Sequence, residues 1–145
     1  YDLDDLDVQY SSIQNAYTNY EKQIAPARTF CLLSEVTELA KQGLIKGGNV
    51  GNAVIIVDTD IDGDEVNLFK EKFGIKFHRG SRGLYKSQQL RFKNEPVRHK
   101  TLDLIGDLAL LGMPIKGHVT AIKSGHKGNV EFARLLRKEF KDQFK

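Results

Sequence analysis

The 145-residue sequence contains one cysteine (Cys31), one methionine, three prolines and no tryptophan. A single thiol excludes an internal disulfide framework and a zinc site built from several cysteines of this chain, and it agrees with a reducing, cytoplasmic location. No stretch approaches the roughly 18 consecutive apolar residues that a membrane-spanning helix needs. The sequence starts YDLDDLDVQY, which is acidic and lacks the pattern of a secretory signal. It does not start with methionine, so we expect it to be a piece of a longer protein.

A large excess of charge of one sign is also missing. The 22 basic and 19 acidic residues give a net charge of only +3, which does not by itself predict a nucleic-acid-binding protein. Basic residues still gather in 76–86 and 134–145. Binding of phosphate or RNA therefore stays open as a minor alternative, with an affinity that would fall steeply with salt. A content of 40% hydrophobic and 28% charged residues is typical of a globular chain.

The pattern of apolar residues predicts a mixed α+β fold in a single domain, 1–145. The predicted fold is a two-layer sandwich in which two or three main helices cover one face of a mixed β-sheet. The expected strands are 7–13, 52–58, 88–94 and 114–124. The expected helices are about 15–23, a segment within 27–42, 66–73, 95–111 and about 130–142. Between them, 75–87 is expected to form a loop or an exposed hairpin.

Each of the longer predicted helices has an apolar stripe that we expect to be buried. In chain order, the stripes consist of Ala16, Tyr17, Tyr20 and Ile24; Phe30, Leu33, Val36, Leu39 and Ala40; Leu102, Ile105, Leu108, Ala109 and Leu111; and Phe132, Leu135, Leu136 and Phe140. Glycine accepts the left-handed backbone that ends helices, so three helices are expected to end at Gly43, Gly74 and Gly112.

Three side chains that can bind metals or carry protons recur every four residues: His99, Asp103 and Asp107. Residues four apart share one face of a helix, so an imidazole and two carboxylates lie together there. His99 and Asp103 can supply two ligands to one zinc ion, because neutral imidazole and carboxylate suit that metal. Two interpretations stay open: half of a metal site, or a solvated helix face with a favourable Asp–His pair.

A further histidine, His126, lies in the glycine-flanked segment SGHKGN. Histidine titrates near neutral pH and can serve as a general acid or base, oriented here by a carboxylate such as Asp107. The alternative is an ordinary surface histidine.

Residues 58–69 (DTDIDGDEVNLF) begin like a calcium-binding EF-hand loop, with Asp58, Asp60, Asp62 and Gly63 at matching positions. The twelfth position of such a loop is a bidentate glutamate, and here it is Phe69. An acidic turn is therefore the preferred interpretation.

Several motifs taken together resemble one family. They are ARTF (27–30), GLIKGGNVGNAVIIVD (43–58), LRFKNEPVRHKTLDLIGDL (90–108), LLGMPIKGHVTAIKSGH (110–126) and Asn129. Over nearly its whole length the chain is similar to the UDP-3-O-acyl-N-acetylglucosamine deacetylases, the zinc amidases of lipid A biosynthesis. The combination of HKTLDLIGD with a downstream SGH is the most specific part of this resemblance. Residues 59–89 depart from it and are expected to form a small βαβ-like insert.

The resemblance implies that the chain is the second of the family's two α+β domains, which hold the active site between them. It implies that His99 and Asp103 are two of three zinc ligands. It also implies that His126 is the catalytic histidine and that Asp107 orients it.

The remaining zinc ligand of the family is a histidine and the general base is a glutamate, both from the first domain. No segment of this chain resembles that domain. His78 lies in the insert and His118 in a predicted strand, so neither is expected to replace the missing ligand.

Other positions match the family's substrate site. Thr29 matches a threonine near the oxyanion, and Phe30 and Lys100 match residues that contact the substrate. Gly47 and Gly48 lie where the family builds the entrance of an acyl passage.

The function implied is zinc-dependent hydrolysis of the N-acetyl amide of UDP-3-O-(3-hydroxyacyl)-N-acetylglucosamine, the committed step of lipid A biosynthesis. The chain would supply part of the active site and, through 30–57, a wall of the acyl passage. Without the N-terminal domain, the isolated chain is expected to bind zinc weakly and to be inactive. The alternative from another class is a non-catalytic binding module that retains the fold.

Overall fold

A computed structural model describes residues 20–43, 51–60, 63–74, 82–85 and 88–144. These residues divide into two compact units. The sheet unit consists of the described residues from Arg28 to Pro96, and the helical unit consists of those up to Ala27 and from Val97 onward.

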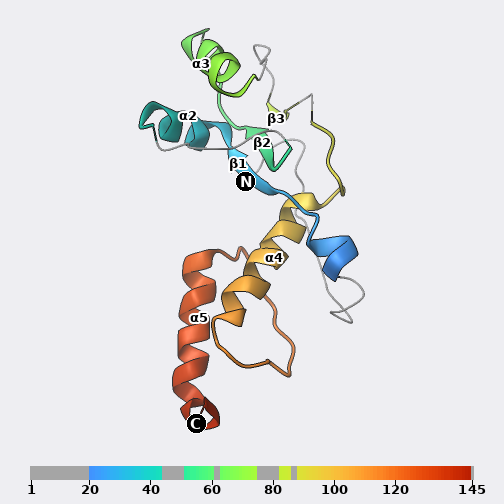
Figure 1. Ribbon diagram of the computed structural model, residues 1–145, viewed down its shortest axis with the longest axis vertical. Coiled ribbons are helices and arrows are strands. Elements are labelled where there is room, and N and C mark those ends of the chain that lie inside the picture. Colours follow the sequence, from blue (N-terminus) through green and yellow to red (C-terminus); the bar gives the residue numbers. More distant parts are fainter. Residues whose placement is uncertain (1–19, 44–50, 61–62, 75–81, 86–87, 145) are drawn as a thin grey trace. The chain divides into compact units, whose positions relative to one another are not determined.

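The sheet unit contains a three-stranded mixed sheet with helices, which confirms the α+β class (Figure 1). Its elements are β1 (Thr29–Leu32), α2 (Leu33–Lys41), β2 (Ala53–Val57), α3 (Gly63–Phe73) and β3 (Gly83–Leu84). The central strand, β2, pairs in parallel with β1 and antiparallel with β3. The parallel pair needs a crossover connection, which α2 provides while packing on both strands.

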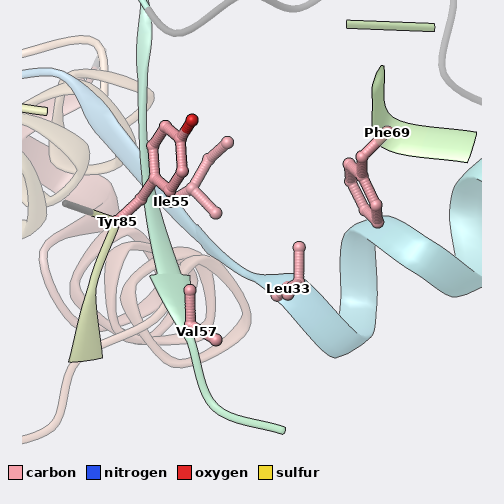
Figure 2. Packing of buried hydrophobic residues seen from close by; sticks show 5 residues of the cluster. All are labelled: Leu33, Ile55, Val57, Phe69 and Tyr85. Atoms are coloured by element: carbon pink, nitrogen blue, oxygen red, sulfur yellow. The ribbon is translucent and has the colours of Figure 1, made fainter. Parts of the chain in front are cut away.

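A continuous apolar run explains why β2 is central. Residues 53–57 (AVIIV) are rich in β-branched side chains, and the last four are at most 5% exposed. Such a run is typical of a strand buried on both faces, so the strand predicted at 52–58 is confirmed. Figure 2 shows its packing with neighbouring elements. The hydrophobic core of the unit consists of Leu33, Ile55, Val57, Phe69 and Tyr85.

The side chain of Gln88 hydrogen-bonds to the backbone of β2, as a neighbouring strand would. Its Oε1 accepts a hydrogen bond from the backbone N–H of Ile55 (2.8 Å), and its Nε2 donates to the carbonyl oxygen of Ala53 (2.7 Å). This buried amide satisfies backbone groups that a further strand would otherwise pair with. The strand predicted at 88–94 is therefore wrong, and the segment consists of irregular backbone and turns.

A buried ion pair joins the start of β1 to the start of α4 (Glu95–Ala109) within the sheet unit. The Glu95 side chain is fully buried and accepts hydrogen bonds from the backbone N–H, Nε and Nη2 of Arg28 and from the backbone N–H of Arg91, at 2.7–3.0 Å. Burial opposes ionisation of Glu95, but these hydrogen bonds and the Arg28 charge outweigh it and lower the pKa of the carboxyl group. The pKa of Arg28 is raised by the same pairing.

The helical unit contains a short π-helical turn (Tyr20–Ile24), most of α4, α5 (His126–Glu139) and a 3-10 turn (Lys141–Phe144). Helix α4 confirms the helix predicted at 95–111, and Pro96 lies in its first turn, where a missing N–H costs no hydrogen bond. Helix α5 begins four residues earlier than predicted, so that His126 is its first residue. An irregular segment joins the two helices (Figure 1).

The strand predicted at 114–124 is wrong. The segment is irregular and largely exposed, and Ile122 is 84% exposed. Alternating apolar residues form a strand only where a neighbouring strand supplies hydrogen-bonding partners, and the described part of the helical unit contains none.

The predicted helix within 27–42 is partly wrong, because Thr29–Leu32 form a strand and only Leu33–Lys41 are helical. Within α2, Leu33 and Ala40 are buried as expected, but Leu39 is 43% exposed. The helix predicted at 66–73 is confirmed and begins slightly earlier, at Gly63. The glycines expected to end helices, Gly43, Gly74 and Gly112, all have positive φ angles.

Predictions of burial are wrong for much of the helical unit. Ile24, Leu108 and Leu111 are buried as expected, but Ala109 is exposed and Tyr20 and Ile105 are 38% and 39% exposed. On α5 the buried residues are Asn129 and Ala133, whereas Phe132, Leu135 and Phe140 are 43–56% exposed. The described residues contain no helix that is both long and apolar enough to cross a membrane.

Some expectations fall outside the described residues. They are the strand at 7–13, most of the helix at 15–23, Gly47, Gly48 and His78. The assignment of the whole chain to one domain and of 59–89 to an insert stays a prediction.

Candidate functional site

Four of the predicted site residues come together in the helical unit. His99, Asp103 and Asp107 lie on one face of α4, and His126 opens α5. His126 Nδ1 lies 2.9 Å from Asp107 Oδ2, and His126 Nε2 lies 3.8 Å from Asp103 Oδ2. The carboxylates are mostly buried, with side chains 12–13% exposed, whereas the His126 side chain is 67% exposed. A solvent-accessible imidazole therefore stands beside two sheltered carboxylates.

His99 is oriented by the backbone of a distant segment. Its Nδ1 lies 3.0 Å from the carbonyl oxygen of Ala27. A carbonyl oxygen can only accept a hydrogen bond, so Nδ1 carries a proton, and in the neutral form of such a ring Nε2 has a lone pair for a metal ion. Histidines that bind metals have this arrangement, with the second ring nitrogen donating to a carbonyl or carboxylate.

The separation of His99 and Asp103 suits a zinc ion. Nε2 of His99 and Oδ1 of Asp103 are 3.4 Å apart. Bonds of about 2.0–2.2 Å in tetrahedral geometry place two ligand atoms about 3.4 Å apart. The two donors therefore fit one zinc ion at the separation observed. The described residues contain no group of three or more His, Cys, Asp or Glu that could hold a metal, so these two need further ligands from elsewhere.

A second network orients His126. Asp107 accepts a hydrogen bond from Nδ2 of Asn129 at 2.9 Å while its oxygens face His126 Nδ1 at 2.9 and 3.0 Å. Burial would raise the pKa of Asp107, but the hydrogen bonds from Asn129 and His126 outweigh it and lower the pKa. Asp107 therefore stays ionised and holds one nitrogen of the imidazole, which leaves the other nitrogen for proton transfer.

The sequence alone assigns no role to Asn129. Its side chain is buried, and its amide fixes the orientation of the Asp107 carboxylate. Its position three residues after His126 points to a shared role, because both side chains lie on one face of a helix that begins at His126.

Lys100, expected to contact substrate, donates a hydrogen bond from Nζ to Asp103 Oδ2 at 2.6 Å. The two oxygens of Asp103 thus have different partners: Oδ1 faces His99 and Oδ2 faces Lys100.

Two further predicted site residues, Thr29 and Phe30, belong to the sheet unit. Thr29 and Phe30 are the first two residues of β1, with Thr29 exposed and Phe30 half-buried. Segment 30–57, expected as a wall of an acyl passage, contributes Leu33, Ile55 and Val57 to the core of this unit. The passage itself stays a prediction.

The acidic turn after β2 caps a helix. Asp58 accepts hydrogen bonds from the backbone N–H (3.0 Å) and the hydroxyl (2.6 Å) of Ser34, at the N-terminus of α2. Burial opposes the ionisation of Asp58, but these hydrogen bonds outweigh it and lower its pKa. Strand β2 precedes this segment where an EF-hand would have a helix, so the segment lacks the first helix of an EF-hand.

A cavity of about 570 Å³ lies beside the start of α5. It is lined by the irregular segment 118–125, which includes His118 and Lys123, and by Asn129 and Phe132. His118 therefore lies in a loop and not in a strand, which corrects its predicted context. The cavity lies within the helical unit, and His126 is not one of the residues that line it.

The fold and the site define an α+β protein in which one helix presents a histidine and an aspartate 3.4 Å apart, next to a hydrogen-bonded network of His126, Asp107 and Asn129. The family model for UDP-3-O-acyl N-acetylglycosamine deacetylase matches residues 1–73 and 78–138. The chain belongs to this family.

Individual relatives agree with this assignment. The chain is 45% identical over 136 residues to the bifunctional enzyme LpxC/FabZ of Chlorobaculum tepidum, an alignment that covers 92% of this chain and 29% of that protein. It is 43% identical over 131 residues to the UDP-3-O-acyl-N-acetylglucosamine deacetylase of Chlamydia trachomatis serovar L2, covering 90% of this chain and 38% of that protein. The chain thus spans about a third of the length of these curated relatives.

Proposed function

We propose that the protein containing this chain is a cytoplasmic, zinc-dependent deacetylase that hydrolyses the N-acetyl amide of UDP-3-O-(3-hydroxyacyl)-N-acetylglucosamine in lipid A biosynthesis. Family membership supports the reaction class. The observation that carries the zinc chemistry is the 3.4 Å separation of His99 Nε2 and Asp103 Oδ1, with His99 Nδ1 held by a backbone carbonyl.

His99 and Asp103 would hold the zinc ion, together with a histidine from another domain. When bound, zinc polarises an amide carbonyl and lowers the pKa of a water molecule. A general base from the same additional domain completes the site.

His126 would act as the general acid. With Nδ1 held by Asp107, its exposed Nε2 can carry a proton toward the departing amine and stabilise the developing oxyanion. Asp107 and Asn129 keep the ring in this orientation. Thr29 would lie near the oxyanion and take part in catalysis. Phe30, Lys100, Gly47 and Gly48 would contact the substrate or its acyl chain.

The test measures deacetylation and zinc content of the full-length protein and its variants. His126→Gln is expected to lower kcat by about 10²- to 10⁴-fold while the zinc content stays at the wild-type level. His99→Ala and Asp103→Ala are expected to lose both zinc and activity. The isolated chain, residues 1–145, should give no measurable turnover.

Wild-type activity of His126→Gln, or full zinc content in His99→Ala, would contradict the proposal. A full-length protein that binds the substrate but releases no acetate would favour the non-catalytic binding module.

A further inference from the structure

The carboxylate of Asp103 already has a cation as its closest partner. Lys100 Nζ lies 2.6 Å from Oδ2, one helical turn before Asp103. The Asp103 side chain is 12% exposed and that of Lys100 is 31% exposed, so this pair is more sheltered than an ordinary surface ion pair. Sheltered charges attract each other more strongly than fully solvated ones.

The ammonium group and a divalent metal ion compete for the same negative charge. His99 contributes no charge of its own as a neutral ligand, so Asp103 supplies the anionic part of this half of the site. A positive charge on Oδ2 makes the carboxylate a weaker ligand through Oδ1 and repels a cation placed there.

Resting on the proposed zinc site, we propose that Lys100 is an internal counter-cation of Asp103. It stabilises the partly buried carboxylate in the metal-free protein and lowers the affinity of the His99–Asp103 pair for divalent metal. When a metal ion binds, it pairs with Asp103 in place of Lys100, and the ammonium group of Lys100 becomes free to bind an anionic ligand. Lys100 thus links the metal content of the site to its affinity for anions, in both directions.

The test compares zinc affinity of the full-length protein and of variants by competition with a chelator. Lys100→Met keeps the length and helix propensity of the side chain but removes its charge. We expect this variant to bind zinc about three- to ten-fold more tightly than the wild type. Lys100→Arg, which retains the charge, and Lys116→Met, which removes an exposed charge from the irregular segment, should bind zinc as the wild type does.

The outcomes separate this proposal from the proposed zinc site. If His99→Ala weakens zinc binding while Lys100→Met leaves it unchanged or weakens it, the counter-cation role is overturned and the zinc site stands. If wild type and His99→Ala bind zinc equally, or neither binds it, both proposals are overturned. Circular dichroism and thermal melting of Lys100→Met check that the variant is folded.

Discussion

Glu95 is a single carboxylate that stabilises three backbone segments of the sheet unit. It is fully buried and bonds to the main chain of Arg28 and Arg91 as well as to the Arg28 guanidinium, so the starts of β1 and α4 share one ion pair. Removing one partner of a buried pair leaves the other charge uncompensated, at a cost of about 3–5 kcal/mol.

We expect Glu95→Gln to lower the free energy of unfolding by about that amount at pH 7. The folded-state pKa of Glu95 lies below its ordinary value of 4.5, so its contribution is present above that value and is lost as the pH falls through the folded-state pKa. Urea unfolding of both proteins between pH 7 and pH 3 measures the difference. The difference should shrink in the acidic range, and a constant difference would contradict this account.

Individual residues also show which parts of the geometry of the candidate site can be predicted from the sequence. The spacing of His99 and Asp103 was enough to predict a shared helix face, because the helical repeat alone fixes that geometry. Contacts between elements are not encoded in spacing. The hydrogen bonds between Asn129 and Asp107 and between His99 and Ala27 join separate segments, so only the structure reveals them.

Among the elements, β2 and α4 were predictable because their patterns agree with their surroundings. A continuous β-branched run makes a buried strand, and a long periodic segment with an early proline makes a helix. The sequence predicts too early a start for α2, because Phe30 and Leu33 also fit a helical period. In the structure, Thr29–Leu32 pair in parallel with β2 and form a strand instead.

Helix α5 shows a different reason for failure. The apolar residues of its sequence predict a buried face, but the buried residues of the helix are Asn129 and Ala133, one polar and one small. Asn129 bonds to Asp107, and Ala133 lies one turn further along the same face. The larger apolar residues are consequently left on the exposed side of the helix.

Two matched substitutions on α5 test this orientation. Leu135→Gln alters a side chain that is 56% exposed and should change the free energy of unfolding by no more than about 0.5 kcal/mol. Ala133→Gln places a long polar side chain where only 5% of the residue is exposed, and it should cost about 1–3 kcal/mol. Urea unfolding of the two variants gives both values, and the reverse order would show that the predicted face is the buried one after all.

For the molecule as a whole, the proposed metal site is predictable only in part from this chain, because the proposal takes further ligands from outside the described residues. One helix places His99 and Asp103 side by side, but the described residues contain no group of three or more His, Cys, Asp or Glu that could hold a metal ion. A chain that spans about a third of its relatives' length leaves room for such a group elsewhere in the full protein.

Zinc is therefore expected to stabilise the folded full-length protein through His99. Zinc at a concentration of 100 times its dissociation constant should raise the free energy of unfolding by about 2.7 kcal/mol. Thermal unfolding with and without zinc measures this effect as a rise in Tm. His99→Ala should show no such rise, and an equal rise in both proteins would place the stabilising ion elsewhere.

The hydrogen bond between His99 and the carbonyl group of Ala27 has a consequence for how the metal would be gained and lost. The two residues are 72 positions apart, so an unfolded chain has to close a long loop before His99 presents Nε2 in the observed orientation. Metal capture and chain compaction then form one coupled equilibrium. A denaturant that opens this loop would release the ion in the same transition. The amount of bound metal would then measure the folded fraction of the chain as well as the affinity of the ligands.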